Sequence, residues 1–104
     1  MIIASSSMIA GKTIIRTLGM VKGNTIRAGH AGIAVLAALK NLVGGEIEEY
    51  TKLMAEAREQ ALDRMIAMAE GLGADAIVDV QFSTSDIMGN AAEILVYGTA
   101  VKLS

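Results

Sequence analysis

Few residues of this chain have side chains suited to a chemical site, and the single histidine is the first of them. His30 lies between Gly29 and Gly32, just ahead of an apolar run. Imidazole suits zinc, copper and nickel, so a ring of His30 copies around an oligomer axis would form a metal site. The chain has no cysteine and no second histidine. A structural role, in which the histidine bonds backbone groups of a loop, is the more common situation for such a residue.

Carboxylates, serines and glycines give weaker patterns. Asp75, Asp79 and Asp86 do not have the spacing of a calcium loop, and Asp75 is expected to bond backbone amides at a turn. The serines at 5–7 have no base nearby in the sequence, so we expect no enzyme and no catalytic residue. The segment 11–13 (GKT) resembles the end of a phosphate loop but lacks its first glycine, because Ser6 stands there.

Composition excludes several classes of protein. The chain has 104 residues, 53% of them hydrophobic, with no proline and a net charge of −2. This length predicts a single domain over residues 1–104. The apolar content excludes a disordered chain, the lack of cysteine excludes a disulfide scaffold, and the lack of a basic cluster argues against nucleic acid as a partner.

The apolar surplus is concentrated in Ala31–Val43, which has 13 residues and includes Lys40 and Asn41. A membrane-spanning helix needs roughly 20 apolar residues, so this run is too short to cross a bilayer. The N-terminus has no basic region ahead of its apolar residues, which argues against a signal peptide. We therefore expect no membrane association and a cytoplasmic protein.

The elements that must position these residues are two helices and several strands. Ala31–Val43 is predicted to form a short apolar helix that ends at Gly44. Glu46–Leu72 is predicted to form a long amphipathic helix, with an apolar stripe facing the core. Its stripe comprises Ile47, Tyr50, Met54, Ala57, Ala61, Met65, Met68 and Leu72.

Strands are predicted on both sides of these helices. Lys12–Ile26 reads as two extended stretches joined by a turn at residues 22–24. Ala76–Phe82 and Glu93–Leu103 read as antiparallel strands, the second apolar on both faces, with Ser83–Ala92 as the loop between them. Within the second, Gly98 is expected to permit close approach of a neighbouring element. The fold class is α+β, a small antiparallel sheet packed with one short and one long helix.

The first predicted helix is apolar nearly all round, and one small sheet can cover only one of its sides. A helix of this kind needs further cover. We therefore predict that Ile33, Leu36 and Leu39 lie in a subunit interface, where the alanines between them allow backbones to approach closely.

Several segments at fixed separations resemble the YbjQ-like family, whose descriptive name is "putative heavy-metal-binding domain". These segments are residues 42–45 (LVGG), 57–59 (ARE), 72–78 (LGADAIV) and 98–102 (GTAVK), together with Tyr50, and they cover nearly the whole chain. The resemblance implies a fold of the dodecin-like group and assembly as a homopentamer. It implies no established enzymatic activity. This chain departs from the family pattern at Glu46-Ile47, and at Ile33-Ala34, where hydrocarbon replaces a charged pair.

The sequence is compatible with two functions. The first is a non-enzymatic homo-oligomer, a pentamer by resemblance, that binds a heavy metal or a small ligand through residues the sequence does not identify, His30 apart. The second is a dodecin-like protein that stores flavin between subunits. Flavin storage usually relies on aromatic stacking, and the chain has only one phenylalanine and two tyrosines.

Overall fold

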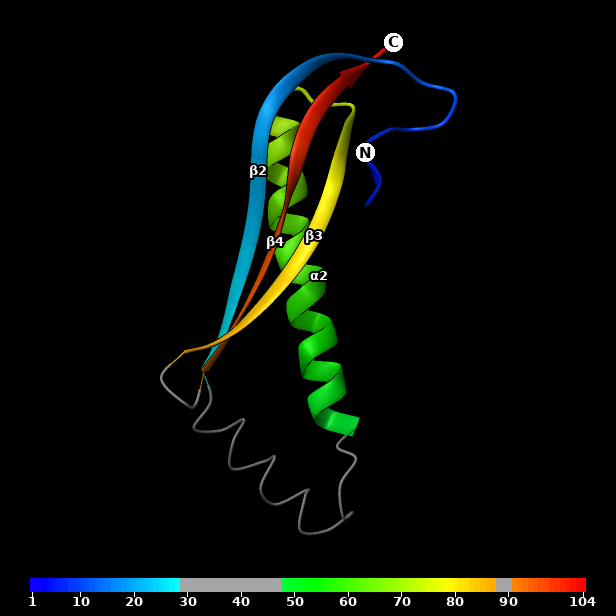
Figure 1. The fold of residues 1–104 in the computed structure, drawn as a ribbon. Helices are drawn as coiled ribbons and strands as arrows, with labels where there is room; N and C mark the ends of the chain where they lie inside the picture. Colours follow the sequence, from blue (N-terminus) through cyan, green and yellow to red (C-terminus); the bar gives the residue numbers. More distant parts are fainter. Residues whose placement is uncertain (29–47, 88–90) are drawn as a thin grey trace.

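A computed structural model describes residues 1–28, 48–87 and 91–104. Its elements are β1 (Ile2–Ile3), β2 (Ile14–Ala28), α2 (Glu48–Gly71), β3 (Ala76–Ile87) and β4 (Ala91–Leu103). They form one four-stranded sheet in the order β1-β3-β4-β2, with α2 lying along one face (Figure 1). The α+β class is therefore confirmed. The predicted short helix at Ala31–Val43 lies outside the described residues.

The sheet is mixed, so the prediction of a purely antiparallel sheet was wrong. β3 and β2 both run antiparallel to β4, but β1 pairs in parallel with β3, through Ile2 opposite Ala76 and Ile3 opposite Ile77. The sequence reading assigned no strand to this two-residue segment. Its pairing continues as an irregular segment, in which the Ala4 N–H donates to the Ile77 carbonyl (2.9 Å) and the Asp79 N–H to the Ser6 carbonyl (2.9 Å).

β2 is one continuous strand, and the predicted turn at residues 22–24 does not exist (Figure 1). Gly23 lies inside the strand, opposite Val96 of β4, because α2 comes so close that a side chain has no room. A Cβ atom at Gly23 would collide with the Ala61 carbonyl oxygen and lie 2.6 Å from the Met65 nitrogen. The glycine that suggested a turn is therefore a packing requirement of the helix.

The long helix was predicted nearly correctly, although its buried stripe differs. Residues 46 and 47 lie outside the described residues, and the helix ends at Gly71 instead of Leu72. Met68 and Leu72 are exposed, whereas Ala69 is fully buried, so the inclusion of these two residues in the stripe was wrong. A four-residue step rotates by about 40° around a helix and a three-residue step by about 60° in the opposite direction. The buried row follows the four-residue steps through Ala57, Ala61, Met65 and Ala69.

The two C-terminal strands are longer than predicted. β3 continues to Ile87 and β4 begins at Ala91, and Ser83–Ile87 pair with residues 91–95 of β4 where a loop was expected. The polar side chains of residues 83–85 suggested a loop, but these residues belong to β3 and are exposed to solvent. The predicted Gly89-Asn90 turn lies outside the described residues.

A bulge interrupts the pairing of β3 with β4 between Val78 and Gln81. Asp79 has a φ of 54° there, which is unusual for a non-glycine residue. Gly98 of β4 lies beside it, and a Cβ atom at Gly98 would be only 2.7 Å from Ile77 Cγ2 and 2.9 Å from the Val78 carbonyl oxygen. The prediction that Gly98 permits a close approach is confirmed, and the approaching element is β3.

The core lies between the sheet and α2. Its fully or almost fully buried members include Val21, Ile77, Ile94 and Val96 from the sheet and Met65 from the helix. A smaller cluster of Ala76, Val78 and Val101 lies on the other face of the sheet, packed by Ile9, Ile14 and Leu103. The N-terminal segment therefore covers only one end of that second face. Among the described residues, no helix is both long and apolar enough to cross a membrane.

Candidate functional site

The residues that the sequence singled out for metal binding and for subunit contact are not among those described. His30, Ile33, Leu36 and Leu39 all fall between residues 29 and 47. Their roles therefore stay predictions. Over residues 1–28, 48–87 and 91–104, no group of three or more histidine, cysteine, aspartate or glutamate side chains could hold a metal ion.

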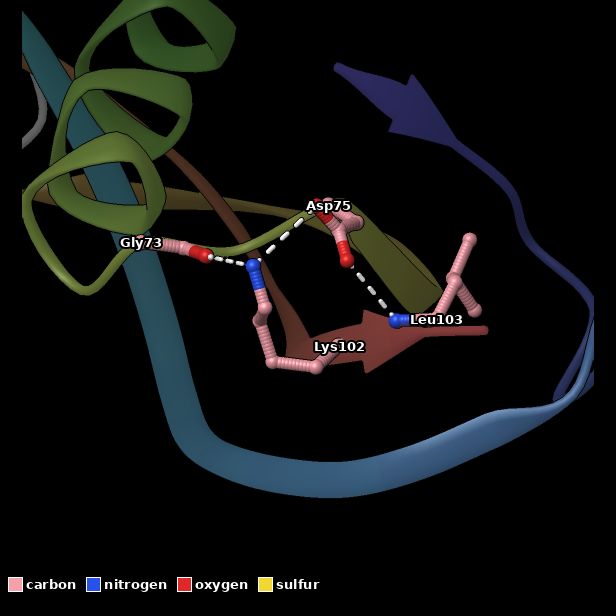
Figure 2. Close-up of polar contacts among 4 residues, drawn as sticks. All are labelled: Gly73, Asp75, Lys102 and Leu103. Atoms are coloured by element: carbon pink, nitrogen blue, oxygen red, sulfur yellow. Dashed lines mark hydrogen bonds and ion pairs between the residues drawn. The ribbon is translucent and has the colours of Figure 1, made fainter.

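Asp75 is at the centre of the best-defined polar cluster in the part of the chain that the structure describes (Figure 2). Its Oδ2 accepts a hydrogen bond from the Leu103 N–H (2.9 Å), and its Oδ1 forms an ion pair with Lys102 Nζ (3.3 Å). Lys102 Nζ also donates to the Gly73 carbonyl (2.9 Å). The expectation that Asp75 binds a backbone amide is confirmed, but that amide belongs to β4 instead of the turn.

This cluster holds elements of the fold together. Gly73 belongs to the exit of α2, Asp75 precedes β3, and Lys102 and Leu103 end β4. The Asp75 N–H donates to the Val101 carbonyl as well (2.9 Å), so the residue is bonded to β4 through both backbone and side chain. The cluster therefore ties the last residues of the chain to the turn between helix and sheet.

These contacts make stability depend on pH. The hydrogen bond from the Leu103 N–H, and then the hydrogen bond from Lys102, lower the pKa of Asp75 below its usual value; burial acts in the opposite sense, and the charges of Lys102 and Lys12 lower the pKa further. Because the folded state favours the ionised carboxylate, the stabilisation is complete above the unfolded-state pKa and is lost as the pH falls through the lower folded-state pKa.

We therefore expect the Asp75→Asn variant to be less stable than the wild type at neutral pH, and the difference to shrink as the medium is acidified. Urea denaturation at a series of pH values from 7 down to roughly 3 measures this difference. The Asp63→Asn variant, which changes an exposed carboxylate on α2, is the control and is expected to show no such convergence. A constant difference for Asp75→Asn at all pH values would contradict the assignment.

The serine and glycine segments have structural roles. Ser6 Oγ donates to the Met8 carbonyl (2.7 Å), and the Lys12 N–H donates to the Ile9 carbonyl (3.1 Å), which makes turns of the segment between β1 and β2. Gly11 takes a φ of 78° in these turns. A strand follows Lys12, whereas a phosphate loop needs the N-terminus of a helix after it. The segment therefore does not have the architecture of a phosphate loop.

A shallow hollow on the outer side of α2 is lined by acidic and small side chains. The lining residues are Ala55, Glu56, Glu59, Gln60 and Asp63. Glu56, Glu59 and Asp63 are exposed, as predicted for the solvated face of this helix. The hollow brings together no acid–base pair or metal-ligand set.

The face of the sheet opposite α2 is the surface that the sequence analysis did not identify, and we call it the open face. It includes Met20, Lys22, Asn24 and Ile26 of β2, and Leu95 and Tyr97 of β4, which occupy the positions between those that face the helix. Met20 is 67% exposed and Ile26 54% exposed. The one sequence signal for this surface was that the last strand is apolar on both faces.

Polar contacts on the open face join neighbouring strands. Asn24 Nδ2 donates to Glu93 Oε2 (3.2 Å), and the Tyr97 hydroxyl donates to Gln81 Oε1 (3.1 Å). These bonds leave the apolar side chains between them uncovered by any described part of the chain. The open face is therefore a candidate contact surface and does not have the shape of a pocket.

The fold defines a class of protein, in which one long helix packs on a mixed sheet of four strands. A crystal structure of a protein of unknown function from Pediococcus pentosaceus, described as belonging to the DUF74 family, has this fold. It matches with a TM-score of 0.66 and 16% identity, over 100% of this chain and 98% of that one. This similarity concerns the fold alone.

Sequence comparison gives the family. The family model YbjQ_1, described as "Putative heavy-metal-binding", matches residues 1–104, and the chain belongs to this family. Curated relatives called "UPF0145 protein" include one from Methanosarcina acetivorans (55% identical over 99% of this chain and 97% of the relative) and one from Halorubrum lacusprofundi (52%, 97% of each). The expected family membership is confirmed, and none of these descriptions is that of an enzyme.

Proposed function

We propose that this protein is a cytoplasmic, non-catalytic homo-oligomer, a pentamer as the family resemblance implies, whose assembled form binds a heavy metal ion or a small ligand. The observation that carries this proposal is the open face of the sheet. Its apolar side chains lie on two neighbouring strands, and no described segment packs on them.

Burial of that face in a subunit contact would remove its apolar surface from water. Complete burial of an aliphatic side chain contributes about 1.5–3 kcal/mol, and Met20 and Ile26 are both more than half exposed. A second copy of the chain is the occupant that agrees with the apolar run Ala31–Val43, for which one small sheet provides too little cover.

The non-catalytic part of the proposal rests on how the polar side chains are used. Ser6 bonds within a turn, Asp75 and Lys102 bond each other and the backbone, and Tyr97 bonds Gln81. Each of these contacts serves the fold. The flavin alternative has no support from Phe82 and Tyr97, because Phe82 pairs with Val96 and Tyr97 with Gln81, which places these two rings on opposite faces of the sheet.

Metal binding depends on assembly under this proposal. Heavy metals favour thiolate and imidazole ligands, and one chain supplies no cysteine and one histidine. The residues of a single described chain therefore do not fit a heavy-metal centre. Only copies of His30 brought together by neighbouring subunits would offer a set of imidazoles. The wild-type oligomer is expected to retain zinc, copper or nickel in equilibrium dialysis, and the His30→Ala oligomer to lose that binding; equal binding by both would contradict the role of His30.

Assembly itself is tested by sedimentation of the Leu36→Asp variant. An aspartate in the predicted subunit contact places a charge in an apolar interface, so this variant is expected to lose the mass of the wild-type oligomer. The Leu72→Asp variant is the matched control, because Leu72 is exposed just beyond the end of α2, and it is expected to keep that mass. A Leu36→Asp variant that retains the wild-type mass would contradict the assignment of the interface.

A further inference from the structure

The sheet has two free edges in the part of the chain that the structure describes. β2 forms one edge over its whole length, because β4 is its only described neighbour. β3 forms the other edge beyond Val80, where its bonds with the N-terminal segment end. Both edges present backbone groups that can pair with a further strand.

The hydrogen bond from Arg64 identifies which groups face outward. Arg64 of α2 donates to the Asn24 carbonyl (2.6 Å), so the backbone groups of Asn24 point away from β4. In an antiparallel ladder this direction alternates from residue to residue. The backbone N–H and C=O groups of Lys22 and Ile26 therefore also point away from β4. Leu95 lies opposite Asn24, so its backbone groups point to β3 and bond those of Ser83. The backbone groups of Phe82 and Thr84, on either side of Ser83, therefore point away from β4.

The outer part of β3 is bare on both of its faces. Residues 81–85 are all exposed, including Phe82 at 49%, although they belong to a regular strand. Natural edge strands are usually protected by lysine, proline or inward-pointing charges. Residues 80–85 contain no charge, and the whole chain has no proline. This edge is therefore built as if a neighbour covers it.

The two edges complement each other in charge and in direction. β2 contains Arg16, Lys22 and Arg27 and no acidic residue, whereas the free part of β3, Gln81–Ile87, contains Asp86 and no basic residue. Both strands run antiparallel to β4, so they are parallel to each other. When the rotation between two copies preserves the strand direction, an edge of β2 brought against an edge of β3 from another copy joins unlike charges in a parallel pair.

We propose that β2 of one copy pairs in parallel with the Gln81–Ile87 part of β3 of the next copy, which extends the sheet from subunit to subunit. This inference rests on the proposed homo-oligomer and adds, beside the open face, a contact between the edges of neighbouring sheets. The contact is head-to-tail, since each copy gives one edge and receives the other, and repeated head-to-tail contacts close into a ring when the rotation allows it. Because Arg64 already donates to the Asn24 carbonyl, the pairing uses the outward backbone groups of Lys22 and Ile26.

Two proline variants test the pairing through the backbone alone. Lys22→Pro removes an outward N–H from β2, and Thr84→Pro removes one from β3, while neither N–H bonds β4. Each variant alone is expected to lose the wild-type oligomeric mass. The Lys22→Ala and Thr84→Ala variants keep the N–H and are expected to retain that mass.

Mixing the two proline variants separates the head-to-tail contact from a symmetric one. The Lys22→Pro copy keeps an intact β3 edge and the Thr84→Pro copy keeps an intact β2 edge, so an equimolar mixture is expected to form 1:1 dimers and nothing larger. A symmetric β2-to-β2 contact would let Thr84→Pro assemble by itself at the wild-type mass, and that result would overturn the proposal. A monomeric wild type would instead refute the proposed function itself.

Amide hydrogen exchange on the wild-type oligomer tests the same contact without any substitution, should a proline variant fail to fold by circular dichroism. The outward N–H groups of Lys22 and Thr84 are both expected to exchange at least tenfold more slowly than in an unstructured chain. Rapid exchange at both positions, or slow exchange at Lys22 with rapid exchange at Thr84, would overturn the proposal.

Discussion

The Gly23→Ala substitution is expected to lower the free energy of unfolding by about 3 kcal/mol, near the upper end for overpacking a core. The added methyl group would meet the Ala61 carbonyl oxygen and the Met65 nitrogen, which are backbone atoms of α2. A flexible side chain could move aside, but here the whole helix must shift away from β2. Urea denaturation at a fixed protomer concentration measures the change.

Gly71→Ala is the matched control for this prediction. Gly71 is the last residue of α2, and a Cβ atom added there meets no atom within 4 Å. Alanine also has the higher helix propensity, so the stability is expected to stay the same or to rise by a few tenths of a kcal/mol. If Gly23→Ala were as well tolerated as Gly71→Ala, the close contact between β2 and α2 would be wrong.

The Met65→Ala substitution is expected to cost about 3 kcal/mol as well, because it leaves a cavity at the centre of the core. Met65 is fully buried, on the side of α2 that faces Val21, Ile77 and Val96. The same denaturation experiment measures this loss.

Met68→Ala gives the comparison within the same helix. Met68 is 45% exposed, so the identical change in side chain is expected to cost well under 1 kcal/mol. The sequence pattern placed both methionines on one apolar stripe, and the structure separates them. Equal losses for the two variants would restore the predicted stripe and contradict the observed packing.

The sequence predicted the elements whose signal lies in their own residues. The long helix and the β-branched parts of the last two strands are of this kind, and so is the close approach at Gly98. The errors concern residues whose role is set by a distant partner. Gly23 suggested a turn because the helix that excludes its side chain comes more than 30 residues later, and the polar residues 83–85 suggested a loop although β4 pairs with them.

The candidate site was predicted less well than the fold. Asp75 was correctly associated with a backbone amide, but the partner, Leu103, lies 28 residues further along the chain. The open face could not be read from β2, because Lys22 and Asn24 stand between its exposed apolar residues Met20 and Ile26. His30 and the predicted contact residues Ile33, Leu36 and Leu39 stay predictions, which the variants above test.

Native mass spectrometry of the wild-type protein, purified without added metal or chelator, tests whether the protein is an oligomer. We expect a single closed assembly of five chains, each of 10.8 kDa, and one measurement gives both the number of subunits and any retained metal or ligand. A mass of one chain at micromolar concentration would contradict the claim that the uncovered face of the sheet is a contact between copies of this protein.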